Sequence, residues 1–368
     1  MDQLLQRMEQ SDQEGAWEMA GKELAKGRGA WEIHLSLFPV VQRVMNPPFI
    51  NPHLPKMYGI IREFLPCMDA EDLPPLLRLE INEYTRRPKS ALLAKPARQP
   101  RSVSFSEIET AIREGDREKG AALMQAFMDQ HGNAELARRL LLLGSGYLDR
   151  SLGHSISCTA YFLLEMIERR DQDPWPVLGT LAEYFCRGHF HTTPEMPATT
   201  EILPQAELDR HLIRATSGYG VVNLHQTITR YTVERVRHLL SEAEYAHLIV
   251  CWVNYLGSKE EETLPAETSA EAAADYASFY RCFSKREEQS AFSALAGLIT
   301  SAEGRLRLGR YLIKGVCDQY QGDYDPHFLT GLGAVLWVVE SCKNRPAIAM
   351  NALRQYLNYF FHKDSSEA

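Results

Sequence analysis

Residues 144–165 read GSGYLDRSLGHSISCTAYFLLE, and this stretch predicts one long helix behind a glycine-rich approach. Four polar side chains of the stretch fall within roughly 60° of one another on such a helix, because each residue turns it by about 100°. They are His154, Cys158, Tyr161 and Glu165. A polar stripe on a largely apolar helix either lines a cavity or faces water.

The rest of the chain carries the same helical signals. Residues 134–143 and 242–256 place apolar side chains at three- and four-residue spacing. Three segments have the form of a capping box ahead of an amphipathic run, namely Ser104 to Glu107, Ser241 to Glu244 and Thr268 to Glu271. Alternating apolar runs joined by hairpin dipeptides are absent from the sequence. We therefore predict an all-α fold, a multi-helix orthogonal array around a central pocket.

The organisation expected from 368 residues is a single helical domain over residues 1–368. Residues 1–87 would form an N-terminal helical layer. Residues 88–103 are rich in proline and basic side chains, and we expect them to be an exposed connection.

The composition narrows the class of protein. A hydrophobic content of 45% with 24% charged residues is typical of a globular protein, and the net charge of −8 is spread along the chain. No basic stripe predicts a nucleic-acid partner, and no apolar run is long enough to predict a membrane span. The start of the chain has no signal-peptide core, and the seven cysteines are dispersed, so we expect a cytoplasmic protein with reduced thiols.

Histidines outside the stripe are further candidates. His53 follows a proline-rich turn, where it could cap a helix, bind a ligand or face solvent. His211 and His225 would point within about 40° of each other on an unbroken helix, although Gly218 and Gly220 permit a break. Thr216 lies in the same polar segment, which could form one wall of a pocket. A satisfied core or surface histidine is the alternative.

Two other patterns have competing interpretations. Tyr311, Lys314 and Asp318 share a helical face, where a Lys–Asp surface pair is the simpler reading. His189 and His191 follow Cys186, which is a possible zinc pattern without an evident fourth ligand.

Several of these segments, in the same order, resemble the questin oxidase-like family of α-helical proteins. The similarity is low and covers most of the chain. Four segments carry it: Asn51 to Ile61, Leu141 to Tyr161, Ala215 to Gly218, and Leu308 to Lys314 with the acidic turn from Gly322 to Leu329.

The resemblance implies an oxidoreductase that inserts oxygen into polycyclic aromatic polyketides or opens their rings. It implies His53, His154 and Lys314 as ligands of a non-haem metal, with iron the expected ion and the lysine deprotonated or carbamylated. NADPH is a further possible cofactor, for which the sequence shows no binding site. The chain departs from the family pattern at Tyr161 and Tyr311, where the family has histidines.

Our leading hypothesis is an oxidoreductase-like protein with an internal pocket for an aromatic small molecule. Its catalytic residues would be His154, Tyr161 and Lys314, and its pocket residues His53, Thr216, His225 and Tyr311. The alternatives are a non-catalytic binding protein with a degenerate metal site, and a helical interaction protein without a pocket.

Overall fold

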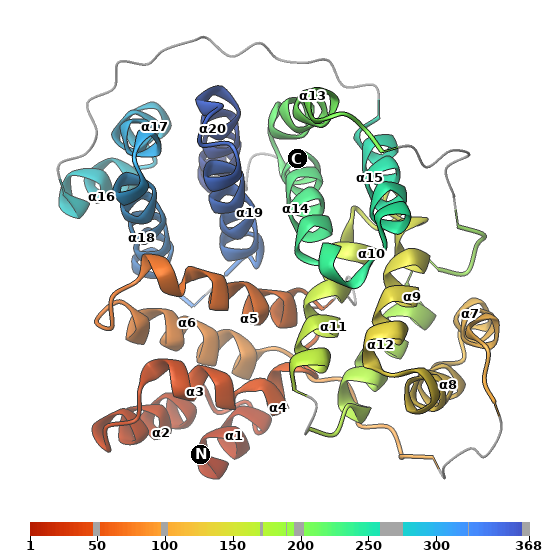
Figure 1. Cartoon of the computed structure of the whole chain (residues 1–368). Helices are drawn as coiled ribbons and strands as arrows, with labels where there is room; N and C mark the ends of the chain where they lie inside the picture. The colour runs from red at the N-terminus through yellow and green to blue at the C-terminus, as the bar shows by residue number, and fades with distance from the viewer. Residues whose placement is uncertain are drawn as a thin grey trace. The chain divides into compact units, whose positions relative to one another are not determined.

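The computed structural model describes residues 1–46, 52–96, 102–169, 172–188, 190–194, 202–257, 275–322 and 324–362. Within these ranges the chain is all-α: it forms α-helices and short 3-10 turns but no strand (Figure 1). In chain order the elements are α1 (Asp2–Glu9), α2 (Gln13–Ala25), α3 (Ala30–Ser36), α4 (Phe38–Val41), α5 (His53–Phe64), η1 (Leu65–Cys67), α6 (Leu73–Arg86), α7 (Phe105–Glu114), α8 (Arg117–His131), α9 (Asn133–Ser145), α10 (His154–Ser157), α11 (Thr159–Glu168), α12 (Trp175–Arg187), α13 (Gln205–Thr216), α14 (Val221–Arg235), η2 (Arg237–Leu239), α15 (Glu242–Leu256), α16 (Tyr276–Ser284), α17 (Glu288–Ala296), η3 (Gly297–Thr300), α18 (Ala302–Asp318), α19 (His327–Ser341) and α20 (Pro346–His362).

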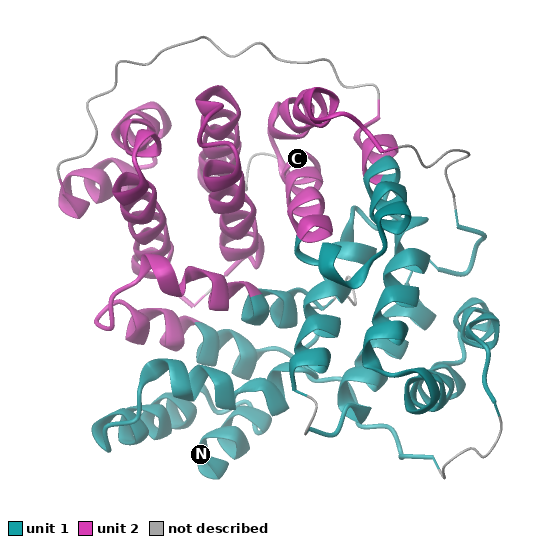
Figure 2. Cartoon of the chain, viewed as in Figure 1, with its two compact units in different colours: residues 1–59, 80–200, 235–251 teal, residues 60–79, 201–234, 252–368 magenta. Residues whose placement is uncertain are grey.

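The chain divides into two compact units, each assembled from three separate segments (Figure 2). Unit 1 contains Met1–Gly59, Glu80–Thr200 and Arg235–Cys251, and unit 2 contains Ile60–Leu79, Glu201–Glu234 and Trp252–Ala368. Four of the five crossings from one unit to the other fall inside helices, namely α5, α6, α14 and α15.

Unit 1 begins with four short helices, in which α1 packs on α2 and α4, and α3 contacts α2 and α4. Helix α8 packs against α7, α9 and α12, while α9 also contacts α10 and α11. The core of this unit is aliphatic and aromatic, with fully buried side chains such as Tyr58, Phe162 and Phe185. Burial of these side chains provides the main stabilisation of the packed helices.

Unit 2 is built around its C-terminal helices. Helix α20 packs along α19 and contacts α13 and α17, and α18 packs against α16, α19, η1 and η3. Buried rings of Phe279, Phe283 and Phe360 stack in its core, since Phe283 lies 5.0 Å from Phe279 and 4.6 Å from Phe360 between ring centroids. Such contacts favour one arrangement of the helices beyond simple area burial.

The sequence predictions for individual helices are largely confirmed. Helix α15 covers residues 242–256 as expected, and α9 extends the predicted 134–143 by a residue or two at each end. The capping box from Ser104 to Glu107 is formed, and Glu244 Oε2 accepts from Ser241 N and Oγ. The one from Thr268 to Glu271 lies outside the described residues.

The prediction of one long helix through the polar stripe is wrong. Residues 154–168 form two helices, α10 and α11, which meet at Cys158. All four side chains of the stripe are buried, so the stripe does not face water. The single-domain organisation over residues 1–368 stays a prediction. Of the expected connection, Lys89 pairs with Val44 in an isolated bridge and Leu93 O accepts a hydrogen bond from Trp175.

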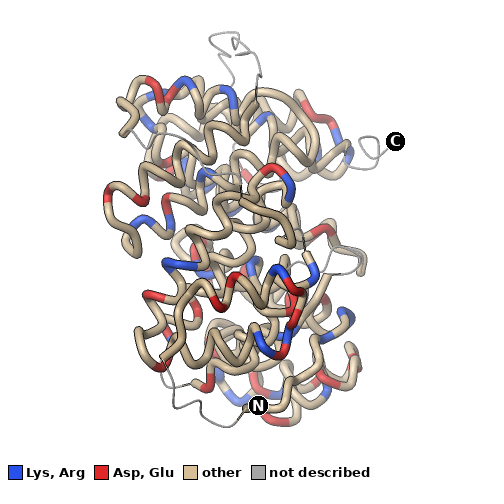
Figure 3. Tube along the Cα trace, turned by 90° about the vertical axis from the view of Figure 1, so that its right-hand side faces the viewer, with Lys and Arg blue, Asp and Glu red and all other residues tan. Residues whose placement is uncertain are grey.

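Surface charge and cysteine chemistry complete this description. Basic and acidic residues are interspersed along most of the described chain (Figure 3). No helix in the described part of the chain is long and apolar enough to cross a membrane. None of the seven cysteines, all of which lie in the described residues, forms a disulfide.

Candidate metal centre

Two histidines of unit 2 meet because helices α14 and α19 approach closely. A Cβ on Gly331 of α19 would lie 2.9 Å from the Leu224 side chain of α14, so a larger residue at this position would force that side chain to move. His327 lies one turn before Gly331, and His225 follows Leu224. The two imidazole rings therefore face each other edge to face, with centroids 4.6 Å apart.

The tautomer of His327 is set by Asp325. His327 Nδ1 lies 2.6 Å from Asp325 Oδ1, which also accepts the backbone N–H of His327 at 2.8 Å. Asp325 Oδ2 accepts a hydrogen bond from Tyr359 Oη at 2.7 Å. Because a carboxylate only accepts, Nδ1 of His327 carries the proton and the lone pair of the neutral ring is on Nε2.

His225 is held in the same tautomer by its own helix. Its Nδ1 lies 2.8 Å from the backbone oxygen of Val221, and a carbonyl can only accept. The lone pair of the neutral ring is thus again on Nε2. The Nε2 atoms of His225 and His327 lie 2.9 Å apart, so two lone pairs would oppose each other at contact distance. A cation between them, either a proton or a metal ion, resolves this repulsion.

The separation of these nitrogens also indicates a coordination geometry. Two nitrogens bound about 2.1 Å from one ion lie about 3.0 Å apart at a right angle and about 3.4 Å apart at the tetrahedral angle. The observed 2.9 Å between His225 and His327 matches neighbouring ligands at a right angle. Right angles are typical of square-planar and octahedral ions, so this spacing favours either geometry over a tetrahedral one.

A second histidine pair lies in unit 1, where α5 runs alongside α10 and α11. The rings of His53 and His154 meet edge to face with centroids 4.4 Å apart. One turn along, the Lys56 amine lies close enough to Cys158 for an electrostatic interaction. One turn further, a Cβ on Gly59 would lie 2.7 Å from the Tyr161 ring. The two chain segments thus lie side by side over three successive contacts.

The close approach at Gly59 leads to a stability prediction. We expect Gly59→Ala to lower the free energy of unfolding by about 1–3 kcal/mol, because the new methyl group must displace the Tyr161 ring. The matched control is Gly21→Ala in α2, where no atom lies within 4 Å and alanine should stabilise by about 1 kcal/mol. Urea unfolding of both variants measures this difference, and equal effects would contradict the packing described.

His53 is oriented by a chain of hydrogen bonds. Arg87 donates to Asn46 Oδ1 at 2.8 Å, which turns the Asn46 amide nitrogen toward Nδ1 of His53 at 3.3 Å. An amide nitrogen only donates, so Nδ1 of His53 accepts. This arrangement favours the tautomer with the proton on Nε2, in contrast to His225 and His327. Coordination of a metal through Nε2 of His53 therefore requires a change of tautomer.

The four histidines of the two pairs make up one group that could hold a metal ion. One ring nitrogen of each of His53, His154, His225 and His327 lies within 4.8 Å of the others, and all four side chains are buried. We refer to these residues as the histidine group.

Lys56 is buried beside this chemistry. Its side chain is fully buried, and its Nζ has no hydrogen-bond partner among the residues that the structure describes. Desolvation lowers the pKa of Lys56 to about 8, and burial raises the pKa of the Cys158 thiol to about 11. Near neutral pH Lys56 is therefore mostly an ammonium, and Cys158 is a thiol without the charge of a metal-binding thiolate.

The buried amine should cost stability. The pKa of Lys56 is about 10.5 in the unfolded chain and about 8 in the folded chain. Below about pH 8 the amine is protonated in both states, and the buried charge lowers the free energy of unfolding. We expect Lys56→Met to raise the free energy of unfolding at pH 7 by roughly 3 kcal/mol, the equivalent of this pKa difference. The gain should shrink as the pH rises from about 8 to 10.5.

Denaturant unfolding at pH 7 and pH 10 measures the effect of Lys56→Met, with the exposed Lys26→Met as control. A variant that is no more stable than the parent at pH 7 would show that the amine has a polar partner after all.

The other predicted residues lie in several environments. Tyr161 is buried in unit 1, and Thr216 donates to Leu212 O within α13. In unit 2, Tyr311 Oη accepts from Arg307 at 3.2 Å. Lys314 donates to Asp72 at 2.9 Å, so its ammonium has no lone pair for a metal. The roles predicted for these residues stay predictions.

The two histidine patterns noted beside them give no site of their own. Helix α13 ends at Thr216 and α14 begins at Val221, with Gly218 and Gly220 both at positive φ, so His211 and His225 lie on separate helices. His189 lies outside the described residues, and Nδ1 of His191 pairs with Arg113 O.

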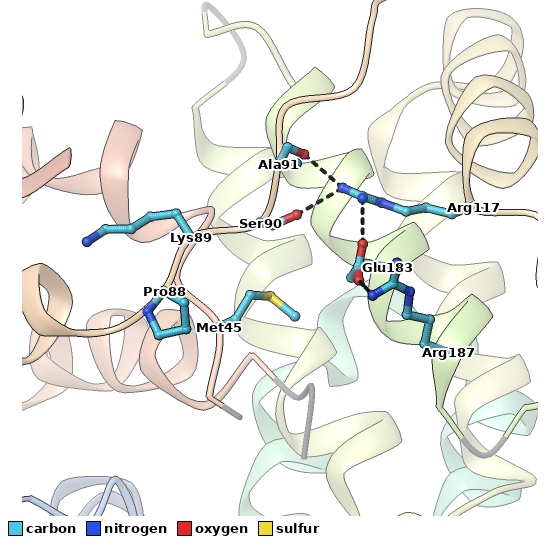
Figure 4. Close-up of a pocket in the computed structure, with 8 residues that line it drawn as sticks. All are labelled: Met45, Pro88, Lys89, Ser90, Ala91, Arg117, Glu183 and Arg187. Atoms are coloured by element: carbon cyan, nitrogen blue, oxygen red, sulfur yellow. Dashed lines mark hydrogen bonds and ion pairs between the residues drawn. The ribbon is translucent and has the colours of Figure 1, made fainter. Parts of the chain in front are cut away.

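A cavity of about 340 Å³ opens elsewhere in unit 1 (Figure 4). Arg117 crosses it and contacts Ser90 Oγ, Ala91 O and Glu183, whose other oxygen pairs with Arg187. None of the predicted site residues lines this cavity. Ser90, Arg117, Glu183 and Arg187 interact with one another, and Lys89 donates to Thr85 O.

The member of the histidine group that sequence reasoning missed is His327. It stands in the segment Gly322 to Leu329, which we noted only as an acidic turn. The sequence signal for it is the run Asp325, Pro326, His327 at the start of a helix, in which a carboxylate precedes the histidine by two residues. The interaction with Asp325 depends on this local spacing.

The chain matches no protein-family model, no curated protein and no solved structure. The resemblance to the questin oxidase-like family therefore stays a prediction, and the candidate function depends on the site itself.

Proposed function

We propose that the protein binds a divalent transition-metal ion through the histidine group and uses it in an oxidoreductase reaction on an aromatic small molecule. The observation that carries the metal proposal is the 2.9 Å separation between the Nε2 atoms of His225 and His327. In both rings Nδ1 donates a hydrogen bond, so the lone pair of the neutral ring is on Nε2. A shared proton would satisfy this pair alone. A metal ion would also give a role to the second buried pair.

The donor set suits iron, zinc, copper or nickel, which all accept imidazole ligands. All four ligands would be neutral imidazoles. Asp325 would not bind the ion but would fix the orientation and the tautomer of the His327 ring through its hydrogen bond to Nδ1. An ion with more than four ligand positions keeps some of them open beyond four imidazoles. Iron bound there would supply oxygen chemistry, which no side chain can provide.

The oxidoreductase part of the proposal is supported by the family resemblance and by the composition of the site. Tyr161 and other aromatic side chains of α5 and α11, such as Tyr58 and Phe162, are buried in the same unit as His53 and His154. Such surroundings favour an aromatic ligand over a sugar or a nucleotide. The polycyclic phenols implied by the resemblance are the first substrates to test.

A second candidate is a metal-binding protein without catalysis. The observation that favours it is the engagement of two predicted catalytic or pocket groups elsewhere: Lys314 is held by Asp72, and Tyr311 by Arg307. A protein that lacks those groups at its metal could bind a ligand without converting it.

The experiment that separates these candidates measures metal content and oxygen uptake on the same preparation. We expect about one ion per chain in protein purified without chelators, and oxygen uptake when a hydroxylated anthraquinone is added to the iron-loaded form. One ion per chain without oxygen uptake supports the non-catalytic candidate. A protein that takes up no metal after incubation with iron, zinc or copper would contradict both.

A further inference from the structure

The Lys56 amine is a buried polar group at the contact of α5 with α10, and it forms no hydrogen bond with the described residues. Its Nζ is fully buried and has no hydrogen-bond partner in the described part of the chain, although an ammonium has three donors to satisfy. No carboxylate is among the groups that influence its charge, which are burial itself and Cys158. A buried charge without a partner is costly, so a partner from outside the chain would relieve it.

The position of Lys56 places that partner beside the proposed metal. Lys56 follows His53 by three residues, so the two side chains lie on one face of α5. Cys158, which the amine approaches, follows His154 by four residues. The amine thus lies one turn from both histidines of the unit 1 pair.

The charges of the site favour an anion. The histidine group contributes four neutral ligands, and the Asp325 carboxylate already accepts from His327 and Tyr359. A divalent ion with four neutral ligands, beside an ammonium, leaves an excess of positive charge in a buried place. An anionic ligand in an open coordination position would neutralise it and accept from Lys56 at the same time.

We propose that Lys56 is the anion-binding residue of the metal centre, where its ammonium donates to an anionic oxygen, such as a phenolate, of the bound small molecule. This inference rests on the proposed metal site. It goes beyond that site because it names the charge of the ligand and the residue that selects it.

The test uses the full chain loaded with cobalt(II), whose visible spectrum reports on its ligands. Azide, a small anion, and imidazole, a neutral ligand, are titrated at pH 7 into the parent and into Lys56→Met. We expect the variant to bind azide at least tenfold more weakly and to bind imidazole within twofold of the parent. Lys89→Met is the matched control, because the Lys89 amine already donates to Thr85 O, and it should change neither affinity.

The outcomes are distinct. Equal azide affinity in the parent and Lys56→Met, or an equal loss for azide and imidazole, would overturn the role of Lys56 while leaving the metal site intact. A parent chain that gives no cobalt spectrum overturns the metal site and this inference with it. Since methionine removes a buried charge, the variant is expected to fold, and its circular dichroism spectrum confirms this before titration.

Discussion

Replacing His327 with alanine is expected to reduce bound metal from about one ion per chain to less than a tenth of that. The change removes one of two nitrogens 2.9 Å apart, and with it the ring that Asp325 orients. Loss of a ligand should weaken affinity by more than the 10- to 100-fold that loss of an orienting partner typically costs. Metal analysis after dialysis, followed by competition with a chromophoric chelator, measures the effect.

The control for this substitution is His362→Ala. His362 is half-exposed at the end of α20, where it pairs with Glu288, and its loss should leave metal content unchanged. His225→Ala should match His327→Ala, because the two rings share one gap. Full metal content in both His225→Ala and His327→Ala would mean that the ion binds elsewhere.

The second large effect is expected at the residues that form hydrogen bonds to Nδ1 of the histidines. Substitutions at two of them should change the metal affinity in opposite directions. Asp325→Asn should weaken metal binding by about 10- to 100-fold, since an amide can turn its nitrogen toward Nδ1 of His327 and favour the wrong tautomer. Asn46→Asp should strengthen it by about tenfold, because a carboxylate would accept from Nδ1 of His53 and free Nε2 for the metal. Chelator competition gives both affinities.

Thermal unfolding of the metal-free variants tells ligand orientation from simple destabilisation. Asp325→Asn and Asn46→Asp are nearly isosteric, so neither should prevent folding. Tyr359→Phe removes only the outer hydrogen bond to Asp325 and should have a smaller effect than Asp325→Asn. A fall in metal affinity for both Asp325→Asn and Asn46→Asp would contradict the tautomers assigned to His327 and His53.

Local rules predicted much of the fold. Capping boxes and apolar spacing identified helices such as α7, α9 and α15, because these signals depend only on neighbouring residues. The break at Cys158 was missed, since the segment has neither proline nor glycine there. A Cβ on Gly144 of α9 would lie 2.6 Å from Ser155 O, so α9 and α10 pack closely next to the break. Packing between two helices of this kind cannot be read from the residues at the break itself.

The site shows the same division. His154 and His225 were chosen for the polar character of their segments, and both belong to the histidine group. His327 and Lys56 were not identified, because their significance depends on tertiary contacts: an opposing ring for His327 and complete burial for Lys56. Lys314 was chosen from its helical face, and the structure pairs it with Asp72, which is 242 residues away in sequence.

The most direct test of the central claim is X-ray absorption at the metal edge of the loaded protein, paired with anomalous diffraction from its crystals. The account predicts a single ion bound by imidazole nitrogens about 2.1 Å away, including Nε2 of both His225 and His327. A fully loaded protein whose ion is ligated by carboxylates or thiolates, with His225 and His327 sharing only a proton, would contradict it.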